Sequence, residues 1–209
     1  FTGVYAAGDA SSSGLHGADV LAGNRLLEAI CSGESAGIHA SEWITKRKFT
    51  GASALETSLN IAEAELNMLG AESDGPVQRL KPVVQRLCEI LTSTQTPAVD
   101  ASALESASES LNQLSIRGEQ LHCDETSFIA NQNLLETLRA QAAIRLGLAS
   151  VRSAELRTES RGLHQRSDYP DTDSEQLHHN LVYNNGSTGI LALRKGPSGN
   201  WILNPTSAV

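Results

Sequence analysis

The 209-residue sequence has few aromatic residues (4%), only three cysteines and no long apolar run. It offers no stretch apolar enough to cross a bilayer, and its formal net charge of −8 argues against nucleic acid or an anionic membrane surface as the main partner. Because the cysteines lack short spacings, we expect neither disulfides nor a metal, and a reducing, cytoplasmic location. No Gly-x-Gly-x-x-Gly follows a strand, so the sequence predicts no pyrophosphate site of its own.

Leucine, alanine and serine are abundant instead, which favours helices over sheet. Several stretches have apolar residues at helical spacing. The longest runs from Ser127 to about Leu156, and the residues expected to point inward are Leu134, Leu135, Leu138, Ala142, Leu146 and Ala149. These helices predict an antiparallel bundle, and the alternating tail around the Asn-Asn-Gly turn at 184–186 predicts a small β-meander.

The expected fold class is therefore mainly α, in three parts. Residues 1–45 read as a strand-loop-helix unit that ends an α/β domain. Residues 53–165 read as an antiparallel helical bundle, and residues 166–209 as a C-terminal extension with β-hairpins.

The opening segment has the pattern of a strand, a tight loop and a helix. Val4 to Ala7 reads as an apolar strand, and Asn24 as the N-cap of a helix that buries Leu26, Leu27 and Ile30. The carboxylate of Asp9 can accept hydrogen bonds from a hydroxyl chain, while free N–H groups at the helix start can donate to a carbonyl or a developing anion. Two interpretations stay open: a ligand site, or an ordinary structural unit with a capping Asn.

Two motifs resemble a known family. Gly3 to Asp9, followed by His16-Gly17-Ala18 and by Asn24 to Glu28, resembles the last FAD-contacting segment of the fumarate reductase, succinate dehydrogenase and L-aspartate oxidase flavoproteins. Arg157 to Pro170 is similar to the same family's Glu-Ser-Arg-Gly-Ala-His-x-Arg-x-Asp-Tyr-Pro signature. Together the motifs bracket most of the chain, which resembles the C-terminal portion of these proteins. The resemblance implies that residues 1–45 are the C-terminal segment of an α/β FAD-binding, Rossmann-like domain that another chain completes.

The resemblance implies FAD as the cofactor. Asp9 and its neighbour Ala10 would contact the ribityl region, and the backbone amides of Asn24, Arg25 and Leu26 would face the pyrimidine side of the isoalloxazine. The positive helix end there would stabilise the negative charge of a reduced flavin. The resemblance also implies a hetero-oligomer, in which a partner N-terminal flavoprotein chain carries the dinucleotide-binding and capping domains, so that this chain is not active alone.

The departures from the family pattern concern the substrate. The family's Asn-Arg is here Asp19-Val20, so the arginine that clamps a substrate carboxylate in the dicarboxylate enzymes is missing. This change favours a substrate other than a dicarboxylate, for instance an amine, in a pocket lined by His16, Asp19 and Val20. In the other interpretation Asp19 faces away, Val20 only packs, and His16 is a loop histidine hydrogen-bonded to backbone.

The charged segment 157–170 also has two interpretations. Its acidic, basic and histidine residues form either an acid/base cluster or a salt-bridged network that locks the bundle onto the nucleotide domain, and the sequence favours the network. His16 remains the sole candidate for a catalytic group.

The expected function is that of the C-terminal chain of a split or processed FAD-dependent oxidoreductase, which transfers hydride from a substrate carbon to flavin. The alternative is a non-catalytic helical interaction subunit of a flavoprotein complex.

Overall fold

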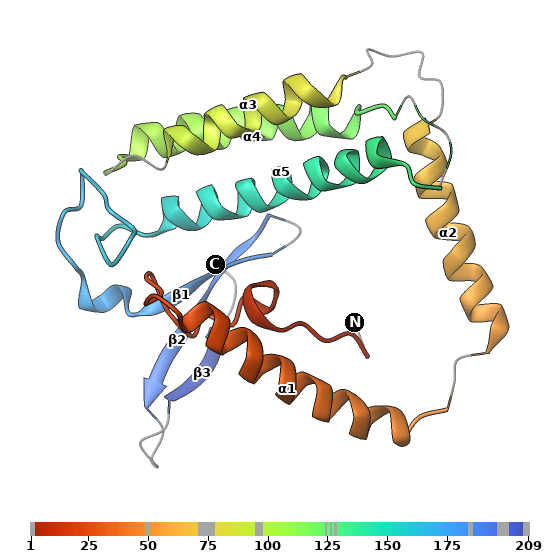
Figure 1. Ribbon diagram of the computed structural model, residues 1–209. Helices are drawn as coiled ribbons and strands as arrows, with labels where there is room; N and C mark the ends of the chain where they lie inside the picture. The colour runs from red at the N-terminus through yellow and green to blue at the C-terminus, as the bar shows by residue number, and fades with distance from the viewer. Residues whose placement is uncertain are drawn as a thin grey trace. The chain divides into compact units, whose positions relative to one another are not determined.

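The structure, a computed structural model, describes residues 3–48, 51–70, 78–94, 98–123, 125, 127, 129–183, 186–195 and 201–206 (Figure 1). Its elements are η1 (Gly8–Ser11), α1 (Asn24–Thr45), α2 (Ala52–Gly70), α3 (Leu80–Ser93), α4 (Ala101–Glu119), α5 (Gln132–Leu156), η2 (Ser174–Gln176), β1 (His178–Val182), β2 (Thr188–Lys195) and β3 (Trp201–Thr206). The chain forms two compact units, Phe1–Leu59 and Asn60–Val209. The predicted limits of the three domains stay a prediction.

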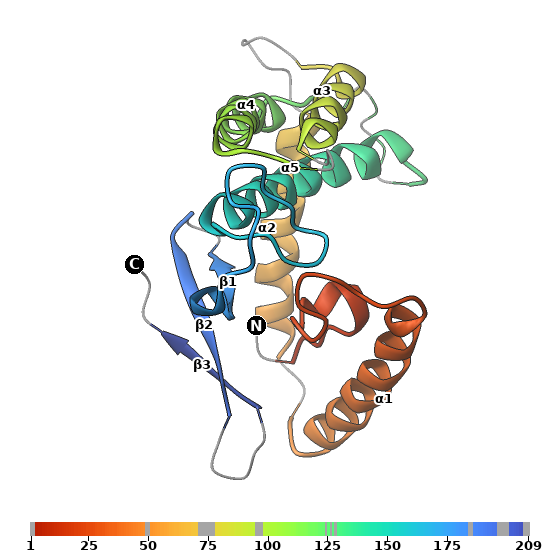
Figure 2. The same ribbon diagram turned by 90° about the vertical axis from the view of Figure 1, so that its left-hand side faces the viewer.

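The second unit is built on α3, α4 and α5, which lie side by side and pack against one another (Figures 1 and 2). Each helix contributes apolar residues spaced three or four apart, and these interdigitate in one core. The core side chains are Val83, Leu87, Ile90, Val99, Leu104, Ala107, Leu111, Leu114, Leu121, Ala140, Ile144 and Val151. The predicted helical bundle is confirmed. None of the helices in the described part of the chain has the length and apolarity needed to cross a membrane.

The start and the inward face of α5 differ from the prediction. The helix begins at Gln132, because the side chain of Asn131 accepts a hydrogen bond from the N–H of Leu134 at 2.8 Å and caps the first turn. Its buried positions are Thr137, Ala140, Ile144, Gly147 and Val151. Three of the leucines expected inside, at positions 135, 138 and 146, are exposed instead, and Leu134 is half-buried.

A three-stranded antiparallel sheet in the order β1-β2-β3 follows the bundle and confirms the predicted meander (Figure 2). Leu181 pairs with Gly189 across the first hairpin, and Leu193 pairs with Leu203 across the second. The Asn-Asn step of the predicted turn, at 184–185, lies outside the described residues. Asn180 on β1 donates from Nδ2 to the carbonyl of Ser153 at 2.9 Å, which ties the sheet to α5.

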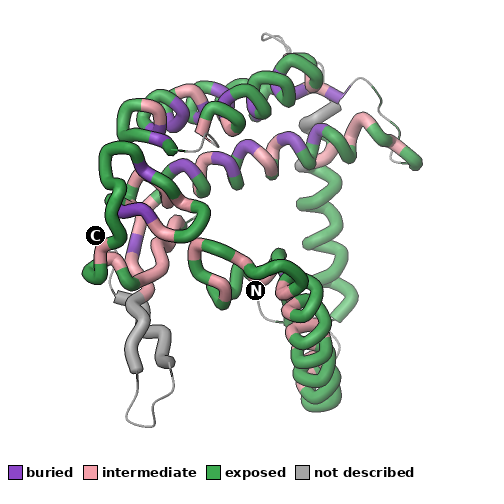
Figure 3. Tube along the Cα trace, turned by 60° about the vertical axis from the view of Figure 1, so that its left-hand side comes forward, coloured by how far each residue is buried: buried purple, intermediate pink, exposed green. Residues whose placement is uncertain are grey.

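The first unit has an unusual pattern of burial: the 22 residues of α1 include none that is buried (Figure 3). Leu26, Leu27 and Ile30, predicted on a buried face, are all more than half exposed. Residues 4–7 are not hydrogen-bonded as a strand, so that prediction is wrong for this structure. A strand is stabilised by neighbours on the sheet, and the described residues place none beside it.

Candidate cofactor and ligand site

The turn at Gly8 fixes the N-terminal segment on α1. Gly8 is buried with φ +60°, and a Cβ there would lie 3.2 Å from the Cβ of Ala29, so both the backbone conformation and the close approach require glycine. Its N–H donates to Oγ of Ser32 at 2.9 Å. This contact holds η1, which carries Asp9 and Ala10, against the first half of α1.

Asp9 and Arg25 come together at this end of α1. The carboxylate of Asp9 lies 3.9 Å from the guanidinium of Arg25, and both side chains are largely exposed. Ala10 follows in η1 and is exposed. An exposed ion pair of this length contributes little to stability, so both groups are free to bind a ligand.

The start of α1 carries unpaired hydrogen-bond donors. Its N-cap is Gly23, in the left-handed conformation with φ +86°, and no side chain caps the helix. Asn24, predicted as the N-cap, is instead the first helical residue, and its N–H donates to the carbonyl of Leu21 at 3.0 Å. Among the described residues, the N–H groups of Arg25 and Leu26 meet no acceptor. Two donors beside an exposed carboxylate fit a ligand that combines a hydroxyl chain with a carbonyl-rich ring, as FAD does.

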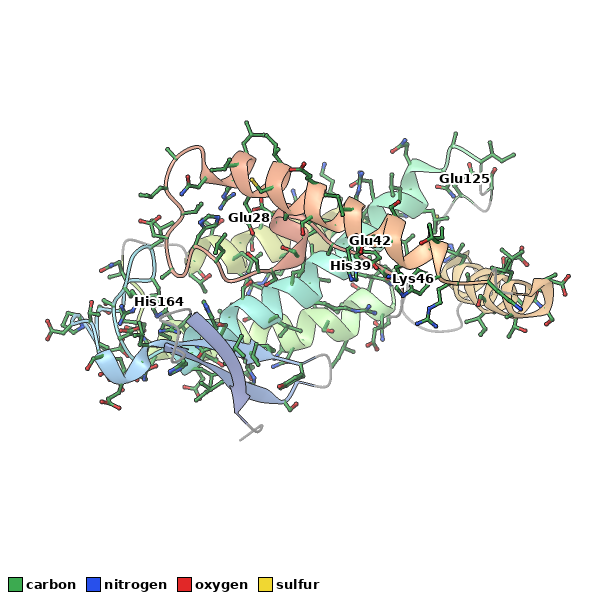
Figure 4. All side chains as sticks on the ribbon, turned by 90° about the horizontal axis from the view of Figure 1, so that it is seen from below. Glu28, His39, Glu42, Lys46, Glu125 and His164 are labelled. Atoms are coloured by element: carbon green, nitrogen blue, oxygen red, sulfur yellow. The ribbon has the colours of Figure 1, made fainter. Side chains whose placement is uncertain are left out.

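Glu28, which the sequence analysis assigned to no site, connects α1 to the loop before it. Its Oε2 lies 2.9 Å from Nε2 of His16, and its Oε1 accepts a hydrogen bond from the hydroxyl of Ser13. Figure 4 shows Glu28 on the half of α1 away from His39, Glu42 and Lys46. The sequence offers one signal for this contact: an acid in the second turn of a helix that follows a loop with a Ser and a His.

His16 therefore bonds to a carboxylate, and the expected alternative of a backbone partner is not what the structure shows. The hydrogen bond from Ser13, followed by those from His16, outweighs partial burial and lowers the pKa of Glu28, so this carboxylate is ionised at neutral pH. The imidazole is held in one orientation by a charged acceptor.

Asp19 and Val20, the other two residues of the expected substrate pocket, lie in the same loop as His16. Between the described residues, no hydrogen bond or ion pair joins either of them to His16. Asp19 is exposed and Val20 is half-buried. A pocket lined by these three residues stays a prediction.

The second charged cluster is centred on Glu159, which is fully buried. Its carboxylate accepts hydrogen bonds from Arg157 at 2.5 Å, from Arg161 at 2.8 and 2.9 Å and from the N–H of Asp173 at 2.8 Å. Burial alone would raise the pKa of Glu159, but these bonds, led by that of Arg161, outweigh it and lower the pKa to about 2. Arg157 also donates to the carbonyls of Gln176 and His178, which ties the end of α5 to η2 and β1.

Arg166 and Asp168 form a second pair next to this cluster. The buried guanidinium of Arg166 binds both oxygens of Asp168 at 2.7 and 2.6 Å, and Asp168 also accepts the N–H of Ala101 at the start of α4. The hydrogen bonds from Arg166 hold the pKa of Asp168 well below its usual range. His164 is half-buried, which lowers its pKa, and its ring lies 3.3 Å from the carbonyl of Arg157.

These contacts support a structural network over an acid/base cluster. Each acceptor is already saturated by arginine or backbone donors of the second unit, so none of them is left to exchange protons. Contact of the network with the nucleotide domain stays a prediction. No group of three or more metal-binding side chains is found within the described residues.

Comparison with known proteins now assigns the chain to a family. Residues 84–198 match the model described as "Fumarate reductase flavoprotein C-term". The chain belongs to this flavoprotein family. Similar curated proteins include the fumarate reductase flavoprotein subunits of Haemophilus influenzae (29% identical over 88% of this chain) and of a Serratia species (30% over 88%), and the succinate dehydrogenase flavoprotein subunit of Rickettsia bellii (30% over 86%).

Solved structures of flavoproteins share the fold at lower identity. A quinol fumarate reductase of E. coli matches 97% of this chain with a TM-score of 0.75 at 22% identity, and the Sdh1 complex of Mycobacterium smegmatis matches 96% with a TM-score of 0.67 at 21% identity. The chain covers about a third of these structures (33% and 32%) and about 30% of the curated relatives named above.

Proposed function

We propose that this chain is the C-terminal part of an FAD-dependent oxidoreductase that oxidises or reduces a small substrate by hydride transfer. The rest of the flavoprotein, which carries the dinucleotide-binding and capping domains, would come from an N-terminal partner, as a second chain or as the remainder of a longer one. The relatives are named as flavoprotein subunits of fumarate reductase and succinate dehydrogenase, and the proposal extends a redox role of this kind to the present chain.

The observation that carries the proposal is the incompleteness of the first unit. One side of α1 holds the N-terminal segment through Gly8, whereas Leu26, Leu27, Ile30 and Ile38 remain more than half exposed on the helix. Apolar exposure along a 22-residue helix is costly in water and is removed when a further layer of protein packs on it. The incomplete layer lies beside the unpaired donors of Arg25 and Leu26, so a completed domain would enclose them with their ligand.

Within that domain the residues of this chain would hold the cofactor. The Asp9 carboxylate would accept hydrogen bonds from the ribityl hydroxyls, and the N–H groups of Arg25 and Leu26 would donate to the pyrimidine edge of the flavin ring. When bound, FAD supplies the two-electron acceptor for hydride. The helix end and its donors favour negative charge on the ring, which favours its reduction.

For the substrate, we propose a neutral or cationic molecule such as an amine. Val20 stands where the dicarboxylate enzymes carry their carboxylate-binding arginine, and Asp19 beside it adds a negative charge to the loop. Without a guanidinium at this position, the loop offers no bidentate partner for a substrate carboxylate.

Native purification followed by intact-mass and visible absorption measurements tests the assembly. We expect a flavoprotein of Rossmann type, on one chain or two, with absorption bands at about 370 and 450 nm. A colourless, folded protein without such a partner would reject the catalytic proposal and favour the non-catalytic interaction subunit.

Asp9→Ala in the complete flavoprotein tests the cofactor site. The substitution should lower FAD affinity by roughly tenfold, since a hydrogen bond to a charged acceptor contributes about 1.5 kcal/mol. Glu34→Gln, which changes an exposed acid elsewhere on the same helical unit, is the control and should leave affinity unchanged. Unchanged flavin content and affinity in Asp9→Ala would show the ribityl assignment to be wrong.

A further inference from the structure

Glu28 is covered in a unit whose neighbouring charges are open to solvent. Its side chain is 8% exposed, against 75% for Asp9 and 68% for Arg25. Because α1 has no buried residue, this cover comes from the loop that includes Ser13 and His16 rather than from a core. A carboxylate is stable under such cover only when its oxygens are hydrogen-bonded.

Both oxygens of this carboxylate are used by the loop. The Ser13 hydroxyl donates to Oε1, and Nε2 of His16 lies 2.9 Å from Oε2. The Ser13 oxygen in turn accepts the N–H of Leu15 at 3.3 Å. A single side chain of α1 therefore fixes both ends of the short loop segment 13–16.

The contact determines which ring nitrogen of His16 can react. An ionised carboxylate only accepts hydrogen bonds, so Nε2 must carry the hydrogen, and Nδ1 of the neutral ring keeps its lone pair. Among the described residues, Nδ1 has no hydrogen-bond partner. The nitrogen that is left to take up a proton is therefore Nδ1.

The other charged groups on the surrounding elements do not contact the imidazole. Asp9 on η1 and Arg25 on α1 face each other at 3.9 Å, and Asp19 in the loop is exposed. In the described part of this unit, the charged side chain that contacts the imidazole of His16 is that of Glu28. Glu28 therefore orients the ring, and a ligand on the Nδ1 side would be the second group in contact with it.

We propose that His16, oriented by Glu28, binds one proton at Nδ1 each time the flavin is reduced by two electrons. The inference rests on the proposed function. The imidazole is anchored through Glu28 to the second turn of α1, while the first turn carries the unpaired N–H groups of Arg25 and Leu26. The ring therefore lies at the same helix end as the donors assigned to the flavin, where negative charge gained on reduction favours the imidazolium.

The atoms and electrons of this step balance. The two electrons come from the reductant, and the proton comes from solvent or from the heteroatom–hydrogen bond of a substrate that loses its other hydrogen as hydride. The bond that forms is Nδ1–H, and it breaks when the flavin is reoxidised. Glu28 keeps its charge throughout and acts as a positioning residue.

If the contact between Glu28 and His16 only stabilised the loop, the same hydrogen bonds would form, but His16 would bind no proton when the flavin is reduced. The midpoint potential of the flavin as a function of pH separates the two cases and needs no knowledge of the substrate. For a two-electron couple, each proton taken up contributes about 30 mV per pH unit. The reduced flavin itself takes up one or two protons, depending on the pH, so uptake by His16 is measured as an extra slope of about 30 mV per pH unit over a protein that lacks this imidazole.

The experiment uses the complete, FAD-loaded protein, titrated with a reductant and a reference dye across the pH range in which imidazoles titrate. His16→Gln keeps an N–H donor for Glu28 but binds no proton. Over part of this pH range the slope of the wild type should therefore be steeper than that of His16→Gln by about 30 mV per pH unit. Glu34→Gln on the same helix is the control and should keep the wild-type profile.

Glu28→Gln tests the positioning residue separately. Without the carboxylate the ring loses the charged acceptor that fixes Nδ1 as its free nitrogen, so the pH dependence of the potential should differ from that of the wild type. If His16→Gln loses its flavin, Glu28→Gln decides the question: a pH dependence equal to that of the wild type overturns the proposal.

The remaining outcomes are distinct. A flavin-loaded wild type whose potential has the same pH dependence as that of His16→Gln overturns this inference alone. A complete protein that holds no flavin overturns the proposed function and the inference with it.

Discussion

The Glu159→Gln variant is expected to lose much of the stability of the second unit. The substitution keeps the size of the side chain but removes the charge that faces Arg157 and Arg161 inside the protein. Both guanidinium groups then keep their positive charge without a counter-charge, and the amide places a second donor against them. Breaking a buried ion pair in this way costs about 3–5 kcal/mol.

The pKa of Glu159 gives a second, independent magnitude. A fall from the ordinary value of 4.5 to about 2 corresponds to about 3 kcal/mol of folding stability, at roughly 1.4 kcal/mol per pKa unit. Because the folded-state pKa is the lower one, this stability is present above pH 4.5 and is lost as the pH falls toward 2. Wild type and variant should therefore differ most at neutral pH and converge in acid.

Urea unfolding followed by far-UV circular dichroism at neutral pH and at about pH 3 measures both effects. Glu136→Gln is the matched control, since Glu136 forms an exposed pair with Arg139 at 2.7 Å and should cost less than about 1 kcal/mol. The reasoning is refuted if Glu159→Gln is as stable as Glu136→Gln, or if the difference from wild type does not shrink in acid.

Two further substitutions test the packing of the bundle and the substrate loop. Gly118→Ala on α4 would place a Cβ 2.8 Å from Cδ1 of the buried Ile144 and should lower the free energy of unfolding by about 1–2 kcal/mol. The control Asn112→Ala, at an exposed position of α4, should change the free energy of unfolding by less than about 0.5 kcal/mol. Equal melting temperatures of the two variants would contradict the predicted overlap. Val20→Arg in the complete flavoprotein should create measurable turnover of a dicarboxylate such as succinate, because it restores a bidentate carboxylate partner. Steady-state assays with succinate and with amines measure this change. An unchanged substrate preference would show that Val20 does not line the pocket.

Much of the fold was predictable from local patterns. The turn chemistry of the tail and the helical spacing of the bundle are properties of a few consecutive residues, and the structure has a meander and packed helices at those places. The charged segment was also predicted as a network, because that many charges without a metal-ligand spacing favour mutual pairing. The family followed from two short motifs, and the match of residues 84–198 agrees with it.

The errors have physical causes that lie outside the local sequence. For α5, both the leucine stripe at 135, 138 and 146 and the stripe through Ile144 and Val151 have helical spacing, and contact with α3 and α4 selects the second. At α1, Asn24 is a good capping residue by type, but the left-handed turn at Gly23 starts the helix one residue earlier and leaves the donors of Arg25 and Leu26 open.

The sequence by itself determined which segments form helices and hairpins, because capping, turn chemistry and apolar spacing act over a few residues. Only the tertiary structure decided which charges meet. Glu28 meets His16, twelve positions before it in the chain, and Glu159 meets the N–H of Asp173, fourteen positions after it. The partner of a buried charge is set by which backbone lies close once the chain has packed, and that distance is not encoded in residue type or local spacing.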